Sequence, residues 1–127
     1  MTQLLFISPE TTNLKEVAAE SEVCGGRIRW ATSGHQALAM LARHQVDLVV
    51  VDETVGDMTG LDFVKRLVSV NPMINCAVVS SLSEEDFHEA SEGLGILMPL
   101  PPRPGRADGQ RLMTHLKRIL GLSAGGD

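Results

Sequence analysis

Asp52 is the residue of this 127-residue sequence that is best placed for chemistry. It directly follows residues 48–51, Leu-Val-Val-Val, an apolar and mostly β-branched run that is too short for a helix. Such a run is typical of a strand buried on both faces, as at the centre of a parallel sheet. The carboxyl ends of these strands form the edge at which open α/β sheets place their sites. Because aspartate is also common in turns, Asp52 alone leaves two interpretations open: a functional carboxylate, or a residue that only ends the strand.

The other residue types that carry chemistry show no comparable arrangement. The four histidines share no ligand spacing. Cys24 and Cys76 lack metal-type spacing, which favours free, buried thiols. Glu53 and Asp57 could enlarge an acidic pocket around Asp52, although acidic residues in a surface loop are usually solvated. No pair of nucleophile and base is evident, so we do not expect an enzyme with turnover.

Five alternations of strand and helix position Asp52. Strands are expected at residues 3–7, 27–32, 48–51, 74–79 and 95–98. Four residues are suited to cap the first four helices: Asn13, Ser33, Thr59 and Ser83. Apolar residues at helical spacing mark a last helix that closes near Gly121. This alternation demands an α/β fold, a parallel sheet with helices on both faces and right-handed crossovers.

Length and charge limit the function classes. Residues 1–121 form one predicted domain, and residues 122–127 a predicted disordered tail. A net charge of −5 argues against a general nucleic-acid binder, which needs a basic face. No apolar run approaches the length of a membrane span, and the N-terminus lacks a basic segment before an apolar one. We therefore expect a cytoplasmic protein that binds neither nucleic acid nor membranes.

Three stretches of the chain resemble one family. They are D-L-V-V-V-D at residues 47–52 with Gly60-Leu61 behind it, W-A-T-S-G-H-Q-A-L-A-M-L at 30–41, and G-L-G-I-L-M-P-L-P-P-R-P at 93–104. All three are similar to the receiver domain of bacterial two-component response regulators, the CheY-like domains. The resemblance implies a five-stranded, doubly wound, flavodoxin-like sheet with strand order 2-1-3-4-5. It also implies phosphorelay signal transduction, with Asp52 accepting a phosphoryl group from a sensor histidine kinase or a phosphotransfer protein.

Several residues that the resemblance implies for the site are missing. The acidic pair that holds Mg²⁺ in the family corresponds to Ser8 and Pro9. The lysine that pairs with the phosphate corresponds to Leu100, and the aromatic switch residue corresponds to Leu97. Ser80 matches the hydroxyl that contacts the phosphoryl oxygen.

Few groups remain to hold a metal ion. The available ligands are Asp52, a backbone carbonyl near Thr54 and Glu10, which starts the loop. One carboxylate with water is a weak holder of Mg²⁺, so we expect weak binding and slow or absent phosphorylation by small phosphodonors. The family's Lys-Pro turn implies a cis peptide bond before Pro101, since an X-Pro bond has only a small trans preference.

The resemblance also indicates where partners bind. In the family, the fourth helix, fifth strand and last helix form a dimerisation face. Here the acidic residues 84–92 oppose basic residues that include Arg111 and Arg118, which suits a homodimer or a downstream protein partner.

Two alternative functions stay open. The chain could be a pseudo-receiver that binds its partner without phosphorylation. Less favoured is a small-molecule-binding module on the same architecture. Residues 8–13 offer hydroxyls but no glycine for a phosphate-cradling loop, and the three Phe, one Trp and no Tyr leave few rings to stack a flavin.

Overall fold

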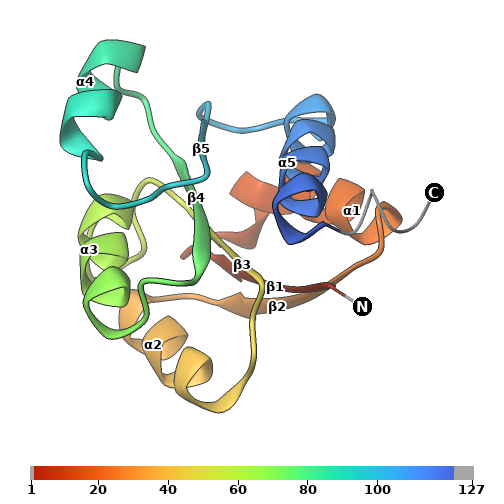
Figure 1. The fold of residues 1–127 in the computed structure, drawn as a ribbon, viewed down its shortest axis with the longest axis horizontal. Helices are drawn as coiled ribbons and strands as arrows, with labels where there is room; N and C mark the ends of the chain where they lie inside the picture. The colour runs from red at the N-terminus through yellow and green to blue at the C-terminus, as the bar shows by residue number, and fades with distance from the viewer. Residues whose placement is uncertain (1, 122–127) are drawn as a thin grey trace.

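A single five-stranded parallel sheet organises the computed structural model, which describes residues 2–121. The strand order is β2-β1-β3-β4-β5, which confirms the predicted doubly wound topology (Figure 1). The predicted tail, residues 122–127, lies outside the described residues. Within those residues, no helix has the length and apolar character needed to cross a membrane.

The elements alternate along the chain. The strands are β1 (Thr2–Ile7), β2 (Gly26–Ala31), β3 (Leu48–Val51), β4 (Asn75–Val79) and β5 (Met98–Leu100). The α-helices are α1 (Lys15–Val23), α2 (Gly34–Arg43), α3 (Gly60–Val70), α4 (Glu84–Ala90) and α5 (Arg106–Leu120). A 3-10 turn (Thr11–Leu14) precedes α1.

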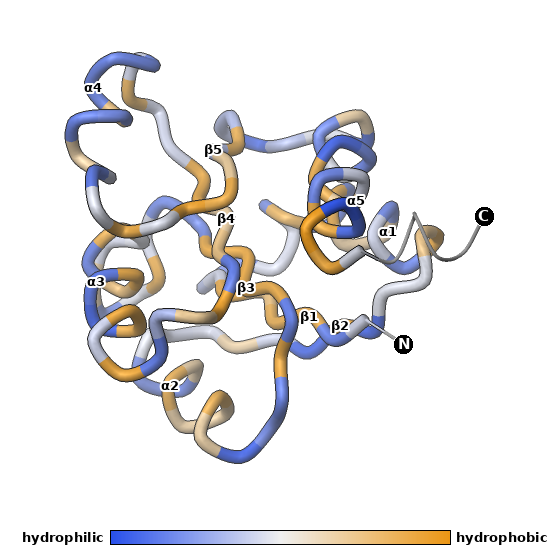
Figure 2. Tube along the Cα trace, in the orientation of Figure 1, coloured by the Kyte–Doolittle hydropathy of each residue, from blue (hydrophilic) through white to orange (hydrophobic). Residues whose placement is uncertain are grey.

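The core lies in two layers, one on each face of the sheet. Alternate residues of β3 point to opposite faces: Leu48 and Val50 join one cluster, and Val49 and Val51 the other. α1 and α5 cover the first cluster, whereas α2, α3 and Phe87 of α4 belong to the second. Hydrophobic residues accordingly run along the central strands in Figure 2. All four side chains of β3 are buried, as the sequence predicts for a central strand.

Three of the four predicted helix caps are confirmed. The side chains of Ser33, Thr59 and Ser83 each accept a hydrogen bond from the backbone N–H three residues ahead. The prediction for Asn13 is wrong, because α1 begins after the 3-10 turn and has no side-chain cap. The Asn13 amide instead donates to Asp52.

The fifth strand lies later than predicted. Gly95 has a φ of +66°, a left-handed conformation that no strand contains, and the ladder with β4 begins only at Met98. The expected cis bond before Pro101 is also wrong, because residues 2–121 contain no cis peptide bond. Trans is the more stable form of an X-Pro bond by about 0.5–1 kcal/mol. In the segment that follows Pro101, the backbone has a left-handed conformation at Arg103, with a φ of +53°.

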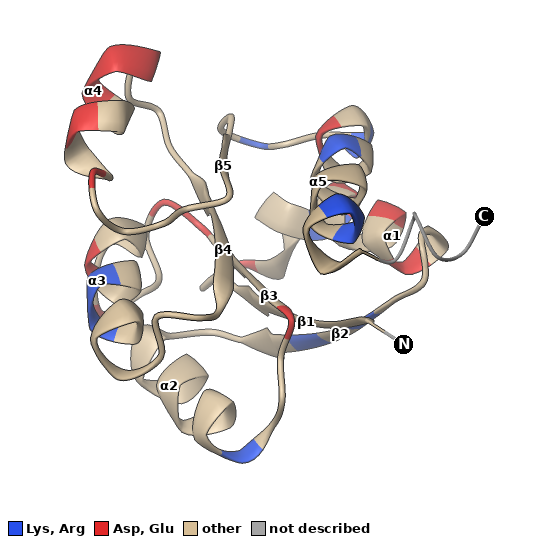
Figure 3. Ribbon diagram, in the orientation of Figure 1, with Lys and Arg blue, Asp and Glu red and all other residues tan. Residues whose placement is uncertain are grey.

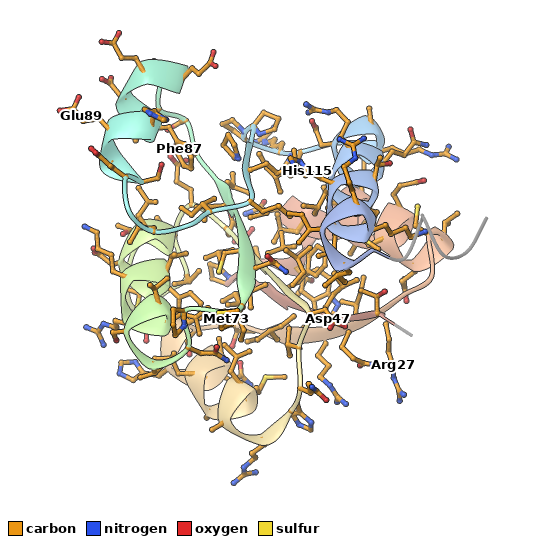
Figure 4. All side chains as sticks on the ribbon, in the orientation of Figure 1. Arg27, Asp47, Met73, Phe87, Glu89 and His115 are labelled. Atoms are coloured by element: carbon orange, nitrogen blue, oxygen red, sulfur yellow. The ribbon has the colours of Figure 1, made fainter. Side chains whose placement is uncertain are left out.

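α4 is the least embedded helix. Among its residues only Phe87 is buried, and Figure 1 shows the helix standing away from β5 and α5. Phe87 lies on the side of α4 that faces the sheet, whereas Glu89 points outwards (Figure 4). A hollow of about 460 Å³ between α4 and β5 is lined by Phe87, Leu100, Pro99 and Pro101, among others.

Candidate functional site

Asp52 lies at the carboxyl end of β3, at the edge where β1 and β4 also end. Its N–H donates to the carbonyl of Ile7 on β1, at 2.9 Å. Only 8% of the residue is exposed. The chain therefore presents one carboxylate in a shallow, mostly enclosed position at the sheet edge, as the sequence predicts.

Three donors hold the Asp52 carboxylate. Oδ2 accepts from the Ser8 hydroxyl at 2.7 Å and from the Asn13 amide at 3.2 Å. Oδ1 accepts from the backbone N–H of Glu53 at 2.8 Å. All three donors are neutral groups, so dipoles of the protein stabilise the negative charge.

The contact between Asn13 and Asp52 was not predicted, because the capping pattern places Asn13 at the start of a helix. A signal was available: β1 and β3 are neighbours in the predicted strand order, so the loop after β1 must pass beside Asp52. An amide in that loop is within reach of the carboxylate, and the first turn of the helix did not need it.

Ser8 is fully buried and makes the closest approach to Asp52. Its Oγ lies 2.7 Å from Asp52 Oδ2 and 2.7 Å from the carbonyl oxygen of Glu10. A hydroxyl has one proton, so Ser8 donates to one of these two oxygens at a time. The N–H of Glu10 donates to Ser8 Oγ at 3.2 Å. The site position that is acidic in the family is thus filled by a hydrogen-bond donor.

Ser80 directly follows β4, and its hydroxyl makes a hydrogen bond within its own loop. Oγ accepts from the N–H of Leu82 at 3.1 Å, and the Ser80 N–H donates to the carbonyl of Leu100 at 3.0 Å. In the described part of the chain, no hydrogen bond joins Ser80 to Asp52. The neighbouring Ser81 instead contacts Glu53.

Leu100 and Leu97 belong to the core. Leu100 is 1% exposed and packs in the same cluster as Leu112 and Met113 of α5. Leu97 is partly buried against that cluster. The position at which the resemblance implies a phosphate-binding cation is therefore an apolar anchor of β5.

The oxygen atoms suggested for Mg²⁺ do not form a cation site. Glu10 and Thr54 are exposed, and Glu10 contacts Ser8 through its backbone. Across residues 2–121, no three His, Cys, Asp or Glu side chains gather in a way that could hold a metal ion. Ser8 and Asn13 direct N–H and O–H groups at Asp52 where a cation needs lone pairs. These residues do not fit a tightly bound divalent ion.

Asp57 faces α2 and not Asp52. Its carboxylate accepts from the N–H groups of Gly34 and His35, at 2.8 and 3.2 Å, and contacts the His35 ring. The Gly34 N–H and then the His35 side chain lower the pKa of Asp57 from 3.8 to about 2. Asp57 thus joins the loop after β3 to the start of α2, and it does not enlarge an acidic pocket.

Comparison with known proteins gives one family. Residues 9–98 match the model of the response regulator receiver domain. Over 67 residues the chain is 30% identical to sporulation initiation phosphotransferase F of Bacillus subtilis (strain 168), a match that spans 53% of this chain and 54% of that relative.

Solved structures share the fold. Chemotaxis response regulator CheY4 of Vibrio cholerae has a TM-score of 0.80 at 17% identity, covering 91% of this chain and 98% of its own. A two-component response regulator from Legionella pneumophila has a TM-score of 0.77 at 21% identity, covering 93% and 99%.

The strand order, the place of Asp52 after β3 and the family match agree with one another. The match covers more than half of the chain. The chain therefore belongs to the response regulator receiver domain family.

Proposed function

We propose that Asp52 is the phosphoacceptor of this receiver. Receiver domains interact with histidine kinases or phosphotransfer proteins and are generally signalling modules, not enzymes. A carboxylate oxygen of Asp52 attacks the phosphorus of a phosphohistidine while the phosphorus–nitrogen bond breaks, and the released imidazole takes up a proton. The observation that carries the proposal is the single carboxylate enclosed at the carboxyl end of β3.

Phosphorylation at this site is expected to be slow. Receiver domains typically bind Mg²⁺ in an acidic pocket. Here Leu100 supplies no charge, and neutral donors from Ser8, Asn13 and Glu53 surround the carboxylate. Neutral hydrogen bonds stabilise an anion less than a cation does, so the incoming phosphoryl charge is poorly offset. We also expect Mg²⁺ to bind only weakly.

Intact-protein mass spectrometry after incubation with acetyl phosphate and Mg²⁺ tests the proposal. We expect the slow gain of one phosphoryl group in the wild type and none in Asp52→Asn. An equal gain in Asp52→Asn would place the modification elsewhere. No gain from either acetyl phosphate or a phosphorylated histidine phosphotransfer protein would refute Asp52 as an acceptor.

A second function, a pseudo-receiver that docks without phosphorylation, is favoured by one specific observation. Donors already satisfy the Asp52 carboxylate, and a core leucine stands where the phosphate-binding lysine is implied. If this function is correct, a partner protein binds wild type and Asp52→Asn with equal affinity. Because Ser8 and Asn13 direct their donors to Asp52 and not into an open cradle, we do not extend the proposal to small-molecule binding.

We further propose homodimerisation through α4, β5 and α5. Figure 3 shows acidic residues on α4 and basic residues on α5. The acidic set is Glu84, Glu85, Asp86, Glu89 and Glu92; the basic set is Arg103, Arg106, Arg111, Lys117 and Arg118. Opposite charges of this kind suit a symmetric contact and make it sensitive to salt.

Arg118→Glu tests this face, because Arg118 is exposed near the end of α5. Sedimentation should show at least about a tenfold weaker dimer, equivalent to about 1.4 kcal/mol. Arg27→Glu, the same charge change on the opposite edge of the sheet, is the matched control. A dimer that survives Arg118→Glu but not Arg27→Glu would show that a different surface is used.

A further inference from the structure

Glu53 connects three parts of the sheet edge through separate groups. Its backbone N–H donates to Asp52 Oδ1 at 2.8 Å, and its carbonyl accepts from the N–H of Gly60, the first residue of α3, at 2.8 Å. Its carboxylate Oε2 accepts from both the N–H and the hydroxyl of Ser81, at 2.7 and 2.6 Å. The residue next to the phosphoacceptor therefore also holds the loop that follows β4.

The Ser81 donors form a small anion site that Glu53 fills. A backbone N–H and a hydroxyl that converge on one carboxylate oxygen make charge-assisted hydrogen bonds, which are stronger than neutral ones. Ser81 directly follows Ser80, the last residue before the turn at the end of β4. These are donors at the same sheet edge as Asp52, and the chain's own carboxylate occupies them.

Apart from the hydrogen bonds of Ser80 with Leu100 and Leu82, the loop between β4 and α4 has few contacts that fix it. Residues Ser80 and Leu82 border hollows on both sides, one of about 240 Å³ towards Glu53 and Thr54, the other of about 460 Å³ towards β5. Leu82 is 44% exposed, and α4 beyond it is anchored in the core only by Phe87. Free space and sparse packing leave the Glu53–Ser81 contact as a main determinant of the loop position.

We propose that Glu53 is a positioning residue, an internal anion that holds Ser81 and sets the β4–α4 loop before any phosphoryl group arrives. A phosphoryl group on Asp52 brings further negative charge beside Glu53 and competes with it for the Ser81 donors. This competition rests on the proposed function of Asp52, whereas the hold on Ser81 does not. The partner-binding face at α4 is thus linked to Asp52 through one carboxylate.

NMR of the full chain tests the hold directly. The Ser81 amide proton should lie further downfield in the wild type than in Glu53→Gln, because a charged acceptor makes the stronger hydrogen bond. Its hydrogen exchange should rise by about threefold to tenfold in Glu53→Ala, the range for a charge-assisted hydrogen bond that water partly screens. Glu22→Gln, which removes the same charge from an exposed position of α1, should change neither. An unchanged Ser81 amide in both Glu53 variants would overturn the proposal.

Acetyl phosphate tests the competition separately. Glu53→Gln should be phosphorylated about threefold or more faster than both the wild type and Glu22→Gln, because a like charge is removed and the Ser81 donors are released. Equal rates would refute competition while leaving the NMR result on the hold intact. Absence of phosphorylation in every variant would refute the role of Asp52, and with it the competition, and the NMR result would still decide whether Glu53 holds Ser81.

Discussion

The Ser8 hydroxyl is within hydrogen-bond distance of the Asp52 carboxylate. Oγ and Oδ2 are 2.7 Å apart, and Ser8 is fully buried, so the protein screens this contact less than water screens a surface pair. A second carboxylate in place of the Ser8 hydroxyl would put two like charges side by side, and a bound cation would be needed to offset their repulsion.

Ser8→Asp tests this interpretation. Without Mg²⁺ we expect a loss of unfolding free energy on the order of 2–4 kcal/mol from like-charge repulsion at an effective dielectric constant near 20. Mg²⁺ should recover much of that loss by binding only the folded state. Ser8→Ala, which loses about 1 kcal/mol with its hydrogen bond, should not respond to Mg²⁺. Denaturant unfolding with and without Mg²⁺ measures both. A Ser8→Asp variant as indifferent to Mg²⁺ as Ser8→Ala would contradict us.

Asp57 gives a pH-dependent contribution to stability. Because its pKa in the folded state is lowered from 3.8 to about 2, the contribution is present above pH 3.8 and is lost as the pH falls through about 2. The difference in Tm between wild type and Asp57→Asn should therefore shrink between about pH 4 and pH 2. Since the Gly34 N–H is the largest cause, His35→Ala should keep the pKa of Asp57 below its ordinary value. A constant difference in Tm across this range would rule out the assignment.

Sequence patterns located Asp52, and the family resemblance placed Ser8 at the site, but neither indicated the roles of Asn13 and Ser81. The apolar run before Asp52 requires a central strand, and the end of that strand fixes the place of the carboxylate. The donors from Asn13 and the Glu53–Ser81 contact depend on how loops of unrelated sequence meet at the sheet edge. These contacts depend on tertiary packing, and no periodic sequence pattern predicts them.

At the level of elements, α3 begins in unusually close contact with the end of β3. A Cβ added at Gly60 would lie 2.4 Å from the carbonyl oxygen of Asp52 and near side chains of Val51 and Val78. The absence of a side chain is what lets this helix start directly behind the site.

Gly60→Ala should therefore lower the free energy of unfolding by about 1–3 kcal/mol, the usual cost of overpacking. Gly105→Ala is the matched control, because its Cβ would come no nearer than 4.0 Å to Asp108. Chemical denaturation of both variants measures the difference. Equal stability of the two variants would mean that the backbone near Asp52 moves aside without cost.

Local chemistry predicted the elements well where it dominates. Ser33, Thr59 and Ser83 cap their helices because each side chain meets a backbone N–H within the same turn. The prediction placed β5 too early because the apolar residues of this segment begin near Gly95, whose left-handed conformation cannot belong to a strand. Only the pairing with β4 determines where the strand starts. The trans bond at Pro101 likewise depends on the path of the whole loop.

For the whole molecule, the two core layers share one sheet. Val49 and Val50 are adjacent on β3 but belong to opposite clusters, and both are fully buried. A loss of packing in either layer therefore loosens a strand that the other layer also needs.

Val49→Ala and Val50→Ala should each cost about 1–3 kcal/mol and keep a single unfolding transition. Trp30, the one tryptophan, packs against the cluster that contains Val50. The centroids of the Trp30 and Phe6 rings are 5.2 Å apart. For Val49→Ala, Trp30 fluorescence and far-UV circular dichroism should nevertheless give the same midpoint of denaturant unfolding. Separate midpoints would show that the two layers unfold independently.

The two edges of the sheet have a consequence for crowded solutions. An exposed strand edge is a template on which other chains can pair and grow into aggregates. β2, at one edge, carries the charged residues Arg27 and Arg29, and β5, at the other, is three residues long and includes Pro99, which has no N–H to donate. Both edges therefore resist strand addition, and the folded domain should stay free of fibrils at concentrations at which an unprotected five-stranded sheet would not.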